Sequence, residues 1–273
     1  MSRPSNAAHQ YVLATGDEGE ERLALVEEAH GSDTERLLKR AGVSHGMRVA
    51  DIGCGSGSVS LKLARFVGSR GTVVGVDLSP EQLTVARRRA ERERLGNMRF
   101  VAASAYSTGL RHESFDAVYA RFLLMHIARP ADALKEMVAL LRKGGILIVE
   151  DGDFASPYSS PDSPAYTRLF ELYRMAVSHS GADPTIGPKL VRMVLDAGMP
   201  NCGVMVVQRI LKDGKAKSLP EGTLLEAAPT LIEAGLCTEE EITSVVEEVR
   251  RLAKDPYTQF AMAQMTQVWA VKP

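Results

Sequence analysis

A strand that runs into a glycine-rich turn and then a helix is the feature that most constrains this chain. Residues 48–57 read Arg-Val-Ala-Asp-Ile-Gly-Cys-Gly-Ser-Gly, and an apolar helical stretch follows at 59–64. Twenty residues after Gly57, a second apolar strand at 72–76 ends in Asp77. Glycines let a ligand approach the backbone, a helix N-terminus favours negative charge, and a carboxylate accepts hydrogen bonds from ribose hydroxyls. The arrangement therefore predicts a nucleoside site.

Strand and helix patterns alternate through the middle of the chain. Strand-like runs occur at 47–52, 72–76, 98–102, 115–120 and 145–150, with helical patterns at about 58–67, 80–95 and 131–142. Such alternation predicts β-α-β units and a parallel sheet. Two later strand-like runs, at 204–207 and 266–271, bring the expected sheet to seven strands, the last of them an antiparallel edge.

Several helix boundaries are marked in the sequence. The N-terminal helical pattern covers 20–41 and is expected to break near Gly31. Ser79, Pro80 and Gln82 have the spacing of a capping box, in which Gln82 would return a bond to the helix start. Further helices are expected at 164–179 and 187–197.

The spacing of the glycines indicates which nucleoside to expect. A dinucleotide fingerprint is G-x-G-x-x-G/A, and its third small residue packs helix against strand. Counting from Gly53 or from Gly55 places Ser58 or Ser60 at that position. The spacing, together with the lack of a Tyr-x-x-x-Lys pair, disfavours a nicotinamide-dependent oxidoreductase, which we keep as a weaker alternative.

The pattern that does occur, Asp-x-Gly-x-Gly-x-Gly at 51–57, resembles the first motif of class I methyltransferases that depend on S-adenosyl-L-methionine (SAM). Residues 114–126 are similar to the family's fourth-strand motif, and residues 133–150 to its next helix, Gly-Gly corner and fifth strand. The resemblance covers about 45–155 and is to the ubiquinone/menaquinone type. It implies SAM as cofactor, S-adenosyl-L-homocysteine as product, and methyl transfer to an O or C atom of a small molecule, such as a quinone or secondary metabolite.

Pattern and resemblance together predict an α/β fold. We expect a Rossmann-like, doubly wound seven-stranded sheet, mostly parallel with the last strand antiparallel. Residues 1–44 would form an N-terminal helical segment that acts as a lid, and 45–155 the SAM-binding core. Residues 156–273 would complete the sheet and add a helical insertion at about 217–262 that covers the substrate.

The resemblance also implies roles for individual residues. Asp77 would take the ribose diol, Leu78 would cover the adenine, and Arg121 would pair with a carboxylate of cofactor or substrate. Asp51 would contact the ligand or only order the glycine loop, and Gln82 would contact the cofactor or only cap its helix. The expected cofactor-binding residues are Asp51, Gly53, Gly55, Gly57, Asp77, Leu78, Gln82, Ser104, Ala105 and Arg121.

Two residues are candidates for a general base. His126 and Asp151 follow the C-terminal ends of strands, where open α/β sheets bind their ligands. The alternatives are a structural histidine and an ordinary acidic turn. No histidine or cysteine spacing is typical of a metal site, and we expect none.

Composition narrows the partners. A net charge of −1 gives no general attraction to nucleic acid or anionic membranes. The run Arg87-Arg88-Arg89 alternates with nearby glutamates, which favours a solvated helix face. No apolar run approaches a membrane span, and three scattered cysteines suit a reducing cytoplasm. We expect a cytoplasmic protein with an apolar or aromatic small-molecule substrate, and homodimer formation stays open. A further alternative is a protein that keeps SAM as a structural ligand or catalyses a non-methyl reaction.

Overall fold

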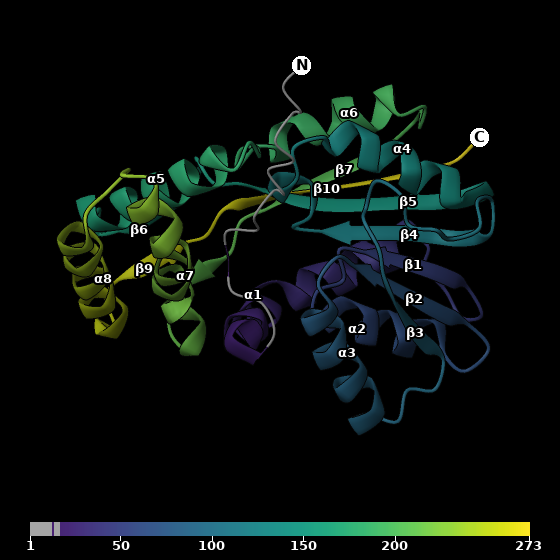
Figure 1. Cartoon of the computed structure of the whole chain (residues 1–273), viewed down its shortest axis with the longest axis horizontal. Coiled ribbons are helices and arrows are strands. Elements are labelled where there is room, and N and C mark those ends of the chain that lie inside the picture. Colours follow the sequence, from purple (N-terminus) through teal and green to yellow (C-terminus); the bar gives the residue numbers. More distant parts are fainter. Residues whose placement is uncertain (1–12, 14–16) are drawn as a thin grey trace, which may run out of the picture.

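The computed structural model describes residue 13 and residues 17–273, and a seven-stranded sheet dominates it (Figure 1). The strand order is β3-β2-β1-β4-β5-β10-β7. The strands are β1 (Arg48–Ile52), β2 (Thr72–Asp77), β3 (Met98–Ala102), β4 (Phe115–Arg121), β5 (Leu141–Asp153), β7 (Gly203–Val207) and β10 (Gln264–Val271). Strands β1 to β5 pair in parallel, whereas β10 runs antiparallel to both β5 and β7. The predicted fold class is confirmed, but the last strand is not the expected edge: β10 lies between β5 and β7, and β7 forms the edge.

Helices cover both faces of this sheet. Figure 1 shows α2 (Ser58–Val67) and α3 (Pro80–Arg92) on one face, and α4 (Pro130–Leu140) and α6 (Leu190–Asp196) on the other. The central strand β1 is accordingly apolar, with Val49, Ala50 and Ile52 fully buried. The strand order reverses between β1 and β4, and open α/β sheets bind ligands at such a switch point, outside the C-terminal strand ends.

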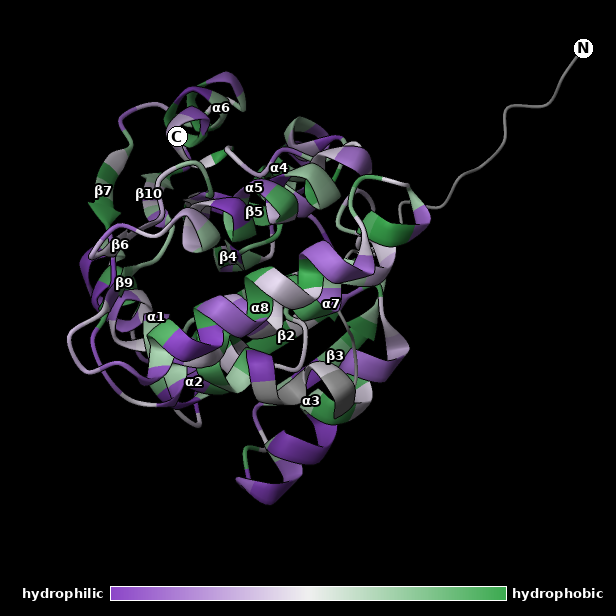
Figure 2. Ribbon diagram, turned by 90° about the vertical axis from the view of Figure 1, so that its left-hand side faces the viewer, coloured by the Kyte–Doolittle hydropathy of each residue, from purple (hydrophilic) through white to green (hydrophobic). Residues whose placement is uncertain are grey.

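A helical cap stands at one end of the sheet. Figure 1 shows α5 (Pro164–His179), α7 (Leu219–Glu233) and α8 (Glu239–Lys254) gathered there with a small sheet. That sheet has the order β6-β9-β8, with strands Tyr158–Ser160, Gln259–Ala261 and Ile210–Leu211. Hydrophobic and hydrophilic residues alternate along α8 in Figure 2, because Val245, Val249 and Leu252 turn one face inward. The remaining turns are 3₁₀ helices η1 (Leu124–His126), η2 (Gly187–Lys189) and η3 (Lys215–Ser218).

The N-terminal helix differs from the prediction. Helix α1 (Asp17–Ala41) continues through Gly31 without a break. Lys62 of α2 donates to the Gly31 carbonyl at 2.9 Å and pairs with Glu27, one turn earlier, at 3.0 Å. A Cβ on Gly31 would lie 2.3 Å from the Glu27 carboxylate. The glycine therefore makes room for a packed ion pair, and this tertiary contact outweighs its low helix propensity.

A second difference concerns the end of α4. The helix ends at Leu140, and Leu141 already pairs with Phe115 in the sheet, followed by a register shift. The predicted helix ran to about 142, and Gly144, with φ of 74°, lies within this irregular start of β5. The small β6-β9-β8 sheet was not predicted, because strands of two or three residues leave no periodic pattern in a sequence.

Candidate functional site

The glycine turn is bonded to the neighbouring strand and opens toward a cavity. The N–H groups of Gly53 and Cys54 both donate to the Val76 carbonyl, at 2.8 and 3.0 Å. Gly55 has φ of 51°, and a Cβ built there would meet no described atom within 4 Å, because it would project into the cavity. A side chain at Gly55 would therefore occupy the space that a ligand needs.

The cavity has a volume of about 540 Å³, within the usual range for small-molecule sites. It is bounded by α1, the glycine turn and the C-terminal ends of β2, β3 and β4. Ten of the twelve residues predicted for the site line it: Asp51, Gly53, Gly55, Asp77, Leu78, Gln82, Ser104, Ala105, Arg121 and His126. The other two, Gly57 and Asp151, are not part of its lining as far as the chain is described.

Gly57 serves the packing around the turn. It is the N-cap of α2 with φ of 80°, and a Cβ there would lie 3.0 Å from the Cβ of Ala86 on α3. Gly57 therefore has a structural role here, and its direct contact with the cofactor stays a prediction. Its missing side chain lets α2 begin against α3.

Asp77 is oriented by the backbone around it. Its carboxylate accepts hydrogen bonds from the N–H of Gly55 at 2.8 Å and of Ser79 at 2.9 Å. Burial raises the pKa of Asp77, and these two bonds oppose that rise. Each carboxylate oxygen can accept further bonds, which suits the two hydroxyls of a ribose. The neighbouring Leu78 is 73% exposed at the cavity edge, an apolar surface that a flat base could cover.

Asp51 lies beneath the turn. It is 2% exposed and accepts a 2.5 Å hydrogen bond from the Ser60 hydroxyl in the first turn of α2. Burial raises its pKa to about 7, although the Ser60 bond and the charge of Arg121 lower it. Asp51 thus orders the loop and also borders the cavity, so both roles considered for it are compatible with its position.

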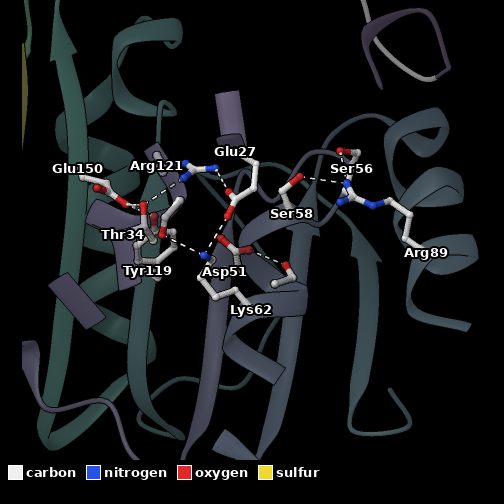
Figure 3. Close-up of polar contacts among 12 residues, drawn as sticks. Glu27, Thr34, Asp51, Ser56, Ser58, Lys62, Arg89, Tyr119, Arg121 and Glu150 are labelled. Carbon is white, nitrogen blue, oxygen red and sulfur yellow. Dashed lines mark hydrogen bonds and ion pairs between the residues drawn. The ribbon is translucent and has the colours of Figure 1, made fainter. Parts of the chain in front are cut away.

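Arg121 is held by a buried polar network that ties α1 to the sheet (Figure 3). Its guanidinium donates to the Glu27 carboxylate at 2.9 Å and to the Thr34 hydroxyl at 3.0 Å. Thr34 in turn donates to Glu150 at 2.6 Å, and Glu150 also accepts from the Tyr119 hydroxyl. The carboxylate that Arg121 contacts in this structure thus belongs to α1, and its pairing with a carboxylate of a ligand stays a prediction.

The two candidate bases differ in their placement. His126 borders the cavity, and burial, with the charge of Arg22, lowers its pKa to about 3. Its imidazole is therefore neutral at pH 7 and only weakly basic. Asp151 is 1% exposed and accepts hydrogen bonds from the N–H of Met125 at 3.1 Å and of Gly152 at 3.0 Å. Asp151 therefore fixes the η1 turn, and its catalytic role stays a prediction.

Sequence reasoning missed Arg89. Its guanidinium donates to the Ser56 carbonyl at 3.1 Å and to the Ser58 hydroxyl at 2.9 Å, so it clamps the glycine turn from α3 (Figure 3). The arginine run had indicated a solvated face. The spacing of Gln82, Ala86 and Arg89, which places all three on one face of the helix, could have indicated that Arg89 faces the glycine turn.

Several other residues that the prediction missed are apolar. They face the cavity from α1 and from the segment after β4, and comprise Leu23, Val26, Phe122, Leu123 and Ile127. Leu23 and Val26 lie within the helical pattern predicted over 20–41, but that pattern does not indicate what their side chains face.

Comparisons with known proteins agree with this geometry. Residues 50–149 match the model of a family described as "Methyltransferase domain". A ubiquinone/menaquinone biosynthesis C-methyltransferase of Azotobacter vinelandii is 32% identical over 56% of this chain and 60% of its own. A protein of the same name from Hahella chejuensis is 30% identical over 62% of this chain and 68% of its own. The chain belongs to the class I SAM-dependent methyltransferases.

Solved structures share the fold of this methyltransferase. The YcgJ protein of Bacillus subtilis aligns over 89% of this chain and 99% of its own, with a TM-score of 0.60 and 17% identity. The cyclase SpnF aligns over 90% of this chain and 82% of its own, with a TM-score of 0.57 and 20% identity. The chain spans between about half and two thirds of the length of the curated relatives it matches.

The family's cofactor is SAM, and the cavity residues fit it. Gly55 leaves its space open, Asp77 offers acceptors for a diol, and the carbonyl oxygen of Gln82 is buried without a hydrogen-bond partner in the described structure. Among the described residues, no group of three or more His, Cys, Asp or Glu side chains is placed to hold a metal ion. Within the same residues, no helix has the length and apolar character that crossing a membrane requires.

Proposed function

We propose that the protein transfers a methyl group from SAM to an O or C atom of an apolar or aromatic small molecule, such as a quinone or a secondary metabolite. One observation carries the proposal. A single cavity joins the residues suited to a nucleoside, Asp77 and the glycine turn, to an apolar wall that includes Val26 and Phe122. Donor and acceptor can therefore meet inside one partly enclosed space.

The chain's own residues would act mainly by orientation. Bound SAM supplies a methyl group activated by its sulfonium. Asp77 and the glycine turn would fix the nucleoside, while Leu23 and Val26 would exclude water above the acceptor. Such positioning can lower a barrier by about 7–11 kcal/mol. A ring nitrogen of neutral His126 can accept a proton from an acceptor hydroxyl, but its pKa of about 3 makes it a weak base.

The names of the relatives support the proposed acceptor and the atom that is methylated. Several are named as C-methyltransferases of ubiquinone and menaquinone biosynthesis, which favours a carbon nucleophile on a quinone-like ring. The apolar wall of the cavity suits such a ring. We therefore place C-methylation ahead of O-methylation.

The non-methyl alternative is kept for one reason. The cyclase SpnF shares this fold, so the fold alone does not decide the reaction. The two functions differ in their products. Methyl transfer consumes SAM and adds 14 mass units to the acceptor, whereas a cyclisation leaves the mass of its substrate unchanged and SAM intact.

The first experiment is calorimetric titration of S-adenosyl-L-homocysteine into the wild type and Asp77→Ala, with NADH as the control ligand. We expect micromolar binding that weakens at least tenfold in the variant, because a ribose diol loses its acceptor. Asp213→Ala, which removes an exposed carboxylate, is the matched control and should bind like the wild type. Folded, ligand-free protein that does not bind the nucleoside would refute the proposed cofactor site.

Turnover is then tested with methyl-labelled SAM and a panel of hydroquinones, naphthols and β-dicarbonyl compounds. Mass spectrometry of the products separates O- from C-methylation by fragmentation. Release of S-adenosyl-L-homocysteine together with a labelled product supports methyl transfer. Nucleoside binding without label transfer to any acceptor, but with isomerisation of a substrate, would favour the cyclase-like alternative.

A further inference from the structure

Phe122, the first residue after β4, has a backbone conformation that is unfavourable for its side chain. Its φ is 51°, in the left-handed region that glycine adopts readily and a bulky residue does not. Of the described residues other than glycine that have a positive φ, Phe122 alone borders the cavity; the others are Arg94, Glu113 and Asn201. Strained residues of this kind cluster at functional sites, where the surrounding structure holds them in place.

The neighbouring strand and helix hold Phe122. Its N–H donates to the Glu150 carbonyl of β5 at 3.1 Å. Its ring makes T-shaped contacts with the rings of His30 on α1 and Phe154 after β5, with centroid distances of 5.5 and 6.4 Å. Gly152 leaves room for these rings, because a Cβ there would lie 2.7 Å from the Phe154 ring and 3.5 Å from the Phe122 ring. Contacts on several sides thus hold the Phe122 ring in one position.

The rings that support Phe122 are uncharged. Burial, together with the charges of Arg121 and Arg209, lowers the pKa of His30 to about 3, so its imidazole is neutral at pH 7. On the other side, the Phe154 ring lies 4.9 Å from the Tyr173 ring of α5, centroid to centroid. A row of neutral aromatic rings therefore backs the side chain of Phe122.

Phe122 lies at the end of the cavity away from the residues suited to the nucleoside. In the strand order, β1 separates β4, which Phe122 follows, from β2, which ends in Asp77. The next residue, Leu123, packs on the glycine turn, because its Cδ1 lies 2.8 Å from the place of a Cβ on Gly53. The half-buried Phe122 ring is thus an aromatic surface at the acceptor end of the cavity.

We propose that an aromatic ring of the acceptor packs against the Phe122 side chain, so that Phe122 selects aromatic acceptors over saturated ones of similar size. The inference rests on the proposed function and narrows its acceptor from apolar compounds to aromatic ones. Two aromatic rings attract each other in offset-stacked or edge-to-face geometry, whereas a saturated ring gains only the burial of its apolar surface. Because His30 and Phe154 already hold the Phe122 ring, binding does not have to order it.

The test compares 2-naphthol with decahydro-2-naphthol, which has the same carbon skeleton and hydroxyl group but no aromatic ring. Both are titrated by calorimetry into protein saturated with S-adenosyl-L-homocysteine, for the wild type, Phe122→Leu, Phe122→Gly and Phe122→Tyr. Phe122→Gly removes the ring and also relieves the backbone, so it replaces Phe122→Leu if that variant does not fold. Glu113→Gly is the matched control, because it relieves the same left-handed conformation at an exposed position outside the cavity lining. Circular dichroism establishes that each variant is folded.

The measured quantity is the affinity for 2-naphthol divided by the affinity for decahydro-2-naphthol. We expect this ratio to be about two- to tenfold higher in the wild type than in Phe122→Leu and Phe122→Gly, the effect of one aromatic pair. Phe122→Tyr and Glu113→Gly should keep the wild-type ratio, and all variants should bind S-adenosyl-L-homocysteine within twofold of the wild type.

Three results would overturn the inference: an unchanged ratio in the variants without the ring, no measurable binding of 2-naphthol to the loaded wild type, or a parallel loss of affinity for S-adenosyl-L-homocysteine in Phe122→Leu. The last result would place the ring against the cofactor. If the wild type does not bind S-adenosyl-L-homocysteine at all, the proposed function itself fails.

Discussion

Replacing Asp51 with Asn should stabilise the protein in a way that depends on pH. Asp51 is 2% exposed beneath the glycine turn, and burial raises its pKa from 3.8 to about 7. The folded state therefore binds this proton more tightly than the unfolded state does. Its contribution to stability is fully present below about pH 4 and is lost as the pH rises through 7. Asn keeps a neutral oxygen that can accept the Ser60 hydrogen bond, and it has no charge to bury.

The size of the effect follows from the pKa. One pKa unit corresponds to about 1.4 kcal/mol, so keeping the ionised carboxylate buried costs the folded wild type about 4 kcal/mol above pH 7. Much of that difference develops between pH 5 and pH 8. Over this interval the free energy of unfolding of Asp51→Asn should rise relative to the wild type by about 3 kcal/mol.

The assay is urea unfolding of ligand-free protein at half-unit steps from pH 5 to pH 8, followed by circular dichroism. Asp213→Asn, at an exposed position, is the control and shows how the loss of an exposed carboxylate changes the free energy of unfolding as a function of pH. Subtracting variant from wild type removes the titration of the buried histidines, which both proteins share. A difference between wild type and Asp51→Asn that stays constant with pH would refute the reasoning, because it would mean that Asp51 is ionised throughout.

Three further predictions concern the surroundings of the cavity. Arg121→Met should lower the free energy of unfolding, measured by urea titration, by about 1–3 kcal/mol, since Glu27 and Thr34 lose the guanidinium while Glu27 keeps Lys62. Adding Glu27→Gln should restore part of the loss, and strict additivity of the two changes would contradict the pairing. Cys54 should react with a thiol reagent at least tenfold more slowly than Cys202, because burial raises the pKa of the Cys54 thiol. The two rates are compared in variants that keep only one cysteine, and equal rates would contradict the prediction. His126→Gln should reduce the turnover rate by less than tenfold, since the pKa of His126 is lowered to about 3 and the imidazole is a weak base. If the pH profile of wild-type turnover has a limb near 6.5 that is missing in the variant, His126 acts as a general base after all.

The nucleoside end of the site could be predicted from the sequence because it is encoded locally. The glycine turn, the end of β2 and the start of α3 lie within 51–82, and each has a residue pattern with a direct physical meaning. The strand order then follows from the β-α-β connections. Six of the ten predicted residues that line the cavity lie in this segment: Asp51, Gly53, Gly55, Asp77, Leu78 and Gln82.

Contacts between distant segments could not be predicted in this way. Arg121 pairs with Glu27, which lies 94 positions away in the sequence, and Thr34 bonds to Glu150, which lies 116 positions away. Neither pair produces a periodic pattern in the sequence. Asp151 shows the same limit, because a carboxylate at a strand end suits catalysis as well as bonding to the backbone N–H of Met125. The hydrogen bond to Met125 became visible only in the folded structure.

The two ends of the cavity are therefore specified by different means. The nucleoside end depends on a continuous segment, in which we expect a change at Gly55 or Asp77 to act directly on the cofactor. The apolar wall depends on where α1 is held, and α1 is held by Thr34 and Glu27 through Arg121 and Glu150 (Figure 3). Substitutions of Leu23 or Val26 can thus reshape the acceptor space without disturbing the strand ends that position the cofactor. A fold organised like this can keep one methyl donor while its acceptors diversify, because the residues that face the acceptor lie on a different element from those that face the donor.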